Sequence, residues 1–149
     1  MSDSSSEGRR WTEAVAVSLL HLPGVDAHPR PAWYCEHLDF ERFLRYPRAD
    51  LGAEVQVLGR REIPLRLSLR CIAEGSREPF NEREVGMDHV ALGVADGAAL
   101  AHWQERLEQA GISCSRTDQP ELSILVFRDP DNIQIELCTP LHPRPTGAS

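Results

Sequence analysis

Two stretches decide the fold of the second half of this chain: DHVALGVAD at residues 88–96 and FRDPDNIQIEL at residues 127–137. The apolar run MDHVALGV (87–94) predicts a strand, and Asp96 is placed to cap the helix that follows. Apolar residues recur along that helix with the spacing of one buried face, and Gly111 supplies its stop. Three more strands are predicted by ISCSR, ELSILVFR and NIQIELC, with DPDN as the last hairpin turn. The predicted order is βαβββ.

The first half of the chain repeats that order. A strand is predicted at 13–22, a short helix at 30–38, and strands at 39–46, 53–59 and 63–72. When the halves are superposed, Asp26 aligns with Asp96 and Trp33 aligns with Trp103. The sequence therefore predicts an internal duplication and an α+β fold built from two tandem βαβββ modules.

The predicted boundaries follow from this duplication. They are a disordered N-terminus at 1–12, a first module at 13–73, a polar linker at 74–85, a second module at 86–139 and a flexible Pro-rich tail at 140–149.

Composition narrows the classes of function. The 149 residues carry 16 basic and 23 acidic side chains, for a net charge of −7, which does not favour nucleic acid as a partner. No apolar run approaches the roughly 20 residues that span a membrane, and the start MSDSSSEGRR lacks the apolar centre of a signal peptide. We therefore expect a cytoplasmic protein. The four cysteines form no CxxC pair, so reduced thiols are expected rather than a zinc knuckle.

The quoted stretches resemble the vicinal oxygen chelate superfamily, the group of glyoxalases, bleomycin-resistance proteins and extradiol dioxygenases. WYCEHLDF in the first half is similar to the family's helix and strand start, with Asp39 where glycine is usual. The resemblance covers roughly residues 13–139 and implies that the modules curl into a partly closed, cup-shaped sheet. It also implies a homodimer, in which modules can be exchanged between subunits.

The resemblance implies metal-ligand positions on the first and last strand of each module. In the second module these positions are His89 and Glu136, and imidazole with carboxylate suits Zn, Fe, Mn or Ni. In the first module, the position equivalent to His89 is predicted to be Leu19, which cannot bind a metal. His21, two residues further on, is a candidate third ligand. Such a set would imitate the two-His, one-carboxylate arrangement of the family's iron dioxygenases.

The fourth position falls on Arg66, or on Ser68 if the register slips by two residues. Neither is a plausible metal ligand, because a guanidinium has no free lone pair. Arg66 could instead form an ion pair with Glu136, as the remnant of an ancestral metal site. Arg66 and Arg70 could also present a fork to a carboxylate or phenolate, or could lie on a solvated outer face. The alternation of Leu65, Leu67 and Leu69 requires one buried face and therefore predicts that the arginines face the cup.

Two functions remain open at this point. The sequence favours a glyoxalase-like binder that sequesters a drug or metabolite, as resistance proteins do, with His21, Arg66, Ser68 and Arg70 as ligand-binding candidates. The alternative is a metal-dependent lyase, isomerase or dioxygenase that uses His89, Glu136 and His21. The expected cofactor is accordingly none, or a single divalent Fe, Mn, Ni or Zn. No GxSxG, P-loop or GxGxxG motif supports other chemistry.

Overall fold

The structure, a computed structural model, describes residues 15–21 and 29–139 and consists of two modules of the same layout. The first contains β1 (Val15–His21), α1 (Pro29–Leu38), β2 (Glu41–Arg48), the short 3-10 helix η1 (Ala49–Leu51), β3 (Ala53–Gly59) and β4 (Leu65–Ile72). The second contains β5 (Val90–Gly93), α2 (Gly97–Gln109), β6 (Cys114–Asp118), β7 (Ser123–Arg128) and β8 (Gln134–Cys138). The predicted pair of βαβββ modules is confirmed.

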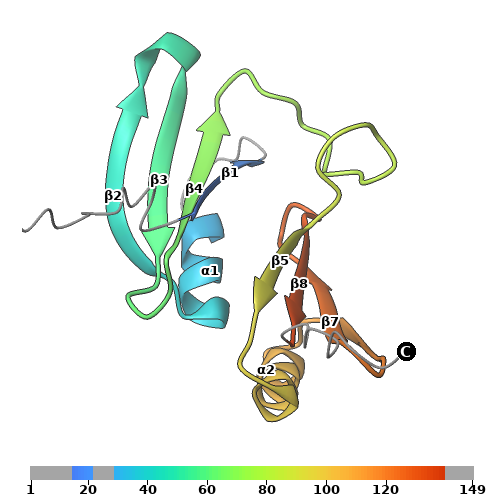
Figure 1. Cartoon of the computed structure of the whole chain (residues 1–149). Helices are drawn as coiled ribbons and strands as arrows, with labels where there is room; N and C mark the ends of the chain where they lie inside the picture. Colours follow the sequence, from blue (N-terminus) through green and yellow to red (C-terminus); the bar gives the residue numbers. More distant parts are fainter. Residues whose placement is uncertain (1–14, 22–28, 140–149) are drawn as a thin grey trace, which may run out of the picture.

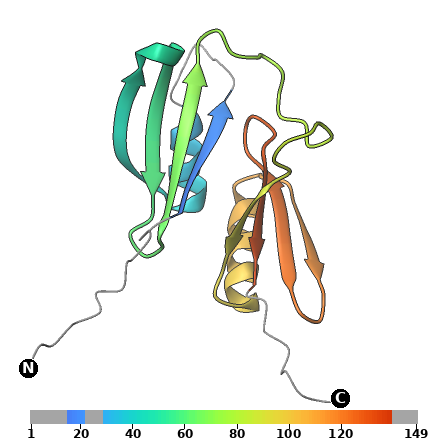
Figure 2. The same ribbon diagram turned by 45° about the horizontal axis from the view of Figure 1, so that its top comes forward.

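Each module forms one four-stranded sheet, with the orders β1-β4-β3-β2 and β5-β8-β7-β6. In each, the first strand runs parallel to the last, and the other neighbours are antiparallel. The sheets lie side by side without closing into a barrel, and α1 and α2 lie on the same side of the pair (Figures 1 and 2). The side of the sheets away from the helices is called the open face below.

Local sequence signals explain the ends of α2. The Asp96 side chain accepts a hydrogen bond from the Ala99 backbone N–H at 2.8 Å, which satisfies one of the free donors at the helix start. Gly111 adopts φ 75° just after the helix, a conformation that glycine takes without a Cβ penalty. In the β7–β8 turn, Asn132 adopts φ 68°, which asparagine tolerates better than most residues.

Strand alternation divides buried from open side chains. In β4, Leu65, Leu67 and Leu69 are buried toward the helices, whereas Arg66, Ser68 and Arg70 alternate with them and are half-buried on the open face. In β8, Ile135 and Leu137 are buried, whereas Gln134, Glu136 and Cys138 are half-buried on the open face. On β4 and β8 the open face is therefore mostly polar, and the leucine and isoleucine side chains of these two strands lie in the core on the helix side.

The core is continuous between the modules. Its buried members come from both sheets and both helices: Leu19, Tyr34, Leu38, Phe40, Leu58, Leu65, Leu67, Leu69, Leu100, Leu107, Leu125, Phe127, Ile133, Ile135 and Leu137. Burying each such side chain contributes about 1.5–3 kcal/mol relative to leaving it in water.

Polar contacts also join α1 to the β7–β8 turn. The hydroxyl of buried Tyr34 donates to Asp129 Oδ2 at 2.8 Å, and Arg30 forms an ion pair with buried Asp131 at 2.7 Å. The other oxygen of Asp129 accepts the backbone N–H groups of Asp131 and Ile133, both at 2.9 Å. Burial and the neighbouring carboxylates raise the pKa of Tyr34 far above its usual range. The tyrosine therefore stays a neutral hydrogen-bond donor.

A second contact ties α2 to the end of α1. Arg106 binds both oxygens of Asp39, at 2.6 and 2.5 Å, and also donates to the Glu36 carbonyl. These hydrogen bonds lower the pKa of the Asp39 carboxyl, although its partial burial opposes that shift. Asp39 adopts φ 56°, which is the left-handed region that favours glycine. Asp39 therefore takes a backbone conformation that favours glycine at the point where its side chain pairs with an arginine of the other module.

Several predicted details are wrong, among them the strand predicted at 39–46, which runs as β2 from Glu41 to Arg48. Strand β5 begins at Val90, so His89 precedes the strand and does not lie within it. Strand β6 runs from Cys114 to Asp118, later than ISCSR indicates. Leu19 pairs in register with Leu69 and is buried in the core, so it is not the counterpart of His89. The alignment of Asp26 with Asp96 was counted through residues outside the described ranges. It shifted the first strand by an odd number of residues, which places its side chains on the wrong face of the sheet.

Neither of the two α-helices in the described ranges is long and apolar enough to cross a membrane.

Candidate functional site

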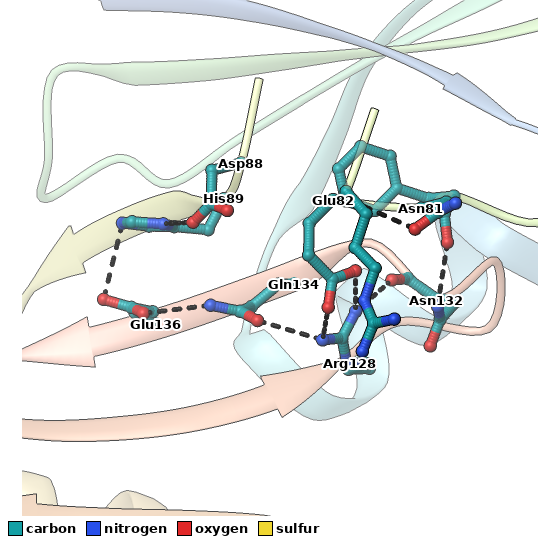
Figure 3. Close-up of polar contacts among 10 residues, drawn as sticks. Asn81, Glu82, Asp88, His89, Arg128, Asn132, Gln134 and Glu136 are labelled. Carbon is teal, nitrogen blue, oxygen red and sulfur yellow. Dashed lines mark hydrogen bonds and ion pairs between the residues drawn. The ribbon is translucent and has the colours of Figure 1, made fainter. Parts of the chain in front are cut away.

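The open face of the second module brings together the two residues predicted as metal ligands. The Nε2 atom of His89 lies 3.5 Å from Glu136 Oε2, and its Nδ1 atom lies 2.6 Å from Asp88 Oδ2 (Figure 3). His89 reaches this position from the residue before β5, and Glu136 reaches it from the middle of the adjacent strand β8. The imidazole is therefore flanked by a carboxylate at each ring nitrogen.

A chain of side-chain hydrogen bonds continues along this face. Gln134 donates to Glu136 at 3.1 Å, and Arg128 donates to Gln134 at 3.0 Å (Figure 3). Arg128 also binds both oxygens of Glu82, at 2.8 and 3.1 Å, and these hydrogen bonds lower the pKa of Glu82. The row of polar groups from His89 to Glu82 is thus held in place by partners at each step.

The sequence interpretation missed three members of this row. Gln134 could have been found, because it lies two residues before Glu136 on the same strand and so shares its face. Arg128 and Glu82 carry no such signal, since their pairing joins β7 to a segment predicted only as a polar linker. That segment is held through the backbone of Phe80: its N–H donates to the Asp131 carbonyl at 3.0 Å, and its carbonyl accepts from Asn132 Nδ2 at 2.8 Å.

The donors on this face do not by themselves make a metal site. The carboxylates of Asp88 and Glu136 approach opposite nitrogens of His89, so they do not converge on one point. Within residues 15–21 and 29–139, no group of three or more His, Cys, Asp or Glu side chains is arranged to hold a metal ion. Zinc and non-haem iron sites usually have at least three protein ligands, and His89 with Glu136 provides two.

On the open face of the first module, Arg66 is already engaged. Its guanidinium lies 4.5 Å from the centre of the Phe43 ring, and Nη1 donates to its neighbour's carbonyl, that of Leu65, at 2.9 Å. Gly59 makes this stacking possible, because a Cβ there would lie 2.6 Å from Phe43 and 3.0 Å from Arg66. The ion pair considered between Arg66 and Glu136 is not formed, and the partner of Glu136 is His89.

Arg70 lies on the same face, but one of its donors is unsatisfied. Its Nε atom is buried and has no hydrogen-bond partner among the residues that the structure describes. Ser68 lies two residues before Arg70 and shares its face. The pKa of Asp50 is lowered by its hydrogen bonds to Arg48 and further by the charge of Arg70. Arg70 therefore carries a positive charge and an Nε–H group that makes no hydrogen bond to a described residue.

The backbone of His21 pairs in register with Cys71 at the end of β1, in step with Leu19 and Leu69. Its side chain lies outside the described part of the chain, so its role as a ligand stays a prediction.

The fold and this face define the class of two-module α+β proteins with a cup-like sheet. The model of the Glyoxalase/Bleomycin resistance protein/Dioxygenase superfamily matches residues 26–137, and the chain belongs to that superfamily. The resemblance inferred from the sequence is confirmed. Among curated proteins, no significant sequence match is found.

Solved structures agree with this assignment. A glyoxylase/bleomycin resistance protein/dioxygenase domain from Frankia sp. EAN1pec is 28% identical, with a TM-score of 0.70 over 85% of this chain and 94% of that one. The fosfomycin resistance protein FosX from Listeria monocytogenes, solved with Mn(II) and sulfate, is 16% identical with a TM-score of 0.60, over 85% and 90%. TnmS3, an antibiotic-binding protein from Streptomyces sp. CB03234, is 18% identical with a TM-score of 0.61, over 85% and 94%.

Proposed function

We propose that the protein binds a small organic anion non-covalently on the open faces of its sheets and sequesters it there. The observation that carries this proposal is the buried Nε of Arg70, which has no hydrogen-bond partner among the described residues. Leaving a buried donor without a partner costs about 1–3 kcal/mol, and more for a charged group. A carboxylate or phenolate of the ligand would accept that hydrogen bond and offset the cost.

Other groups on the open faces complete such a site. Ser68 offers a hydroxyl beside Arg70, and the stacked pair of Phe43 and Arg66 offers a flat apolar surface. His89 and Glu136 supply a donor and an acceptor for a hydroxyl group of the ligand. The similarity in fold to an antibiotic-binding protein supports this kind of function, because the same scaffold there holds a drug.

The alternative function is that of a metal-dependent lyase, isomerase or dioxygenase of the superfamily. It is favoured by the adjacency of His89 and Glu136 and by the fold similarity to FosX, which was solved with Mn(II). Such a metal would act as a Lewis acid toward an oxygen-bearing substrate. It would need further donors from His21 or from a second copy of the chain, in the homodimer expected from the sequence resemblance.

Binding of anthraquinone-2-carboxylate, a three-ring probe with one carboxylate, tests the proposal. Titration followed by 15N-resolved NMR is expected to shift the backbone signals of Ser68, Arg70 and Ala91, which lie on or beside the open faces. Arg70→Gln is expected to weaken binding at least tenfold, because a charge-assisted hydrogen bond is lost. The control is Arg45→Gln on β2, whose exposed guanidinium pairs with Glu54. Equal affinity in both variants, or no saturable binding, would refute the proposal.

A further inference from the structure

A cavity lies on the helix side of the sheets, away from the open faces. Its volume is about 210 Å³, and it lies where the end of α1 and the β3–β4 hairpin meet the end of β5 and the first turns of α2. The side chains lining it are mostly apolar, and they include Leu38, Phe40, Ile63, Leu92, Val94 and Trp103. Both modules contribute to its wall, so it exists only when the modules are docked.

Arg60 is the one charged residue among those lining this cavity. Its guanidinium carbon lies 5.8 Å from the centre of the Trp103 ring, and its Nε is buried without a hydrogen-bond partner among the described residues. Glu62 is mostly exposed, and its carboxylate lies 3.7 Å from this Nε, beyond hydrogen-bond distance. The cavity therefore combines an apolar wall with one cation that has a donor to spare.

The neighbouring charges do not occupy that donor. Asp39 lies near enough for the charge of Arg60 to help lower its pKa, but the hydrogen bonds from Arg106 are the larger cause. Both oxygens of Asp39 accept from Arg106. Arg106 also packs on Trp103, with 5.0 Å between its guanidinium and the ring centre. The second arginine beside the ring thus donates hydrogen bonds to protein partners, whereas the Nε of Arg60 makes none to a described residue and lies 3.7 Å from the carboxylate of Glu62.

We propose that this cavity binds a small aromatic carboxylate, with its ring among the apolar side chains and its carboxylate on Arg60. Size supports a single ring, because a cavity of about 150 Å³ lined by apolar side chains binds benzene. A guanidinium whose Nε is buried without a hydrogen-bond partner among the described residues favours a carboxylate over a neutral head group. The site is separate from the one proposed on the open faces, since its residues lie on the opposite side of the sheets.

Two matched alanines on α2 test the location. Ala99 lines the cavity, whereas its neighbour Ala98 is exposed and does not. Benzoate is the probe, and binding is followed by calorimetry and by NMR shifts at Gly93 and the indole of Trp103. Ala99→Leu, which fills the cavity, is expected to weaken benzoate binding at least tenfold, and Ala98→Leu is expected to leave it unchanged.

The charge of Arg60 is tested separately. Arg60→Gln is expected to weaken benzoate binding at least tenfold. Benzyl alcohol, the neutral analogue, is expected to bind the unmodified protein at least tenfold more weakly than benzoate does. Arg70→Gln is expected to bind benzoate normally, so failure here is distinguishable from failure of the open-face proposal. The inference is overturned if benzoate does not saturate, if Ala99→Leu binds it like Ala98→Leu, or if benzyl alcohol binds as tightly.

Discussion

Replacing Asp129 with alanine is expected to lower the free energy of unfolding by about 3–5 kcal/mol. The side chain is 5% exposed and accepts three hydrogen bonds, one from the Tyr34 hydroxyl and two from backbone N–H groups of the β7–β8 turn. Without this carboxylate, the Tyr34 hydroxyl and the two backbone N–H groups lose their acceptor in a place that water cannot easily reach. The substitution also removes a contact between the first module's helix and the second module's sheet, so the docking of the modules is expected to loosen.

Urea unfolding followed by circular dichroism measures this change. The matched control is Asp118→Ala at the exposed end of β6, where the carboxylate pairs with Arg116 near solvent. That control is expected to unfold at the same urea concentration as the unmodified protein. If Asp129→Ala also unfolds there, the turn does not depend on its buried carboxylate and the description of the contact is wrong.

Phe127→Ala is expected to cost about 3–5 kcal/mol, the range for a large aromatic removed from a core. Phe127 is 2% exposed, and its ring centre lies 6.4 Å from that of Trp33 on α1. The substitution would leave a cavity where the two modules share their core. The expected result in a thermal melt is a large fall in the midpoint.

The neighbouring residue provides the control for Phe127. Val126 precedes it on β7 and points to the open face, where it is half-buried opposite Glu136. Val126→Ala is expected to lower the midpoint by less than half as much. A similar loss in the two variants would mean that the helix side and the open face of this sheet are equally packed, contrary to the division of the strands described above.

The second module was predictable because its signals are local. A capping aspartate, one apolar stripe, a helix stop and a DPDN turn each act within a few residues, and Asp96, Gly111 and Asn132 adopt the roles that their chemistry favours. The alternation of leucine and arginine in β4 likewise predicted the face on which Arg66 and Arg70 lie, because a strand has a period of two.

The candidate site was only partly predictable because it depends on register and on distant contacts. The correspondence of Leu19 with His89 was counted through residues 22–28, outside the described ranges, and a shift by an odd number of residues moves a strand residue to the other face. The partners of Arg128 and Tyr34 come from segments 46 and 95 residues away. Nothing in a local pattern indicates such pairs, and nothing in the sequence shows that Phe43 stacks on Arg66.

The metal content of the protein, purified without chelator and then incubated with Fe(II), Mn(II), Ni(II) or Zn(II), distinguishes the proposed small-molecule binder from the metal-dependent enzyme. His89 and Glu136 supply two donors, and no third described side chain converges on them. We therefore expect well under one metal ion per chain after gel filtration, and the same value for a His89→Ala variant. One tightly held metal ion per chain that disappears in His89→Ala would contradict the proposed binder and establish the metal-dependent alternative.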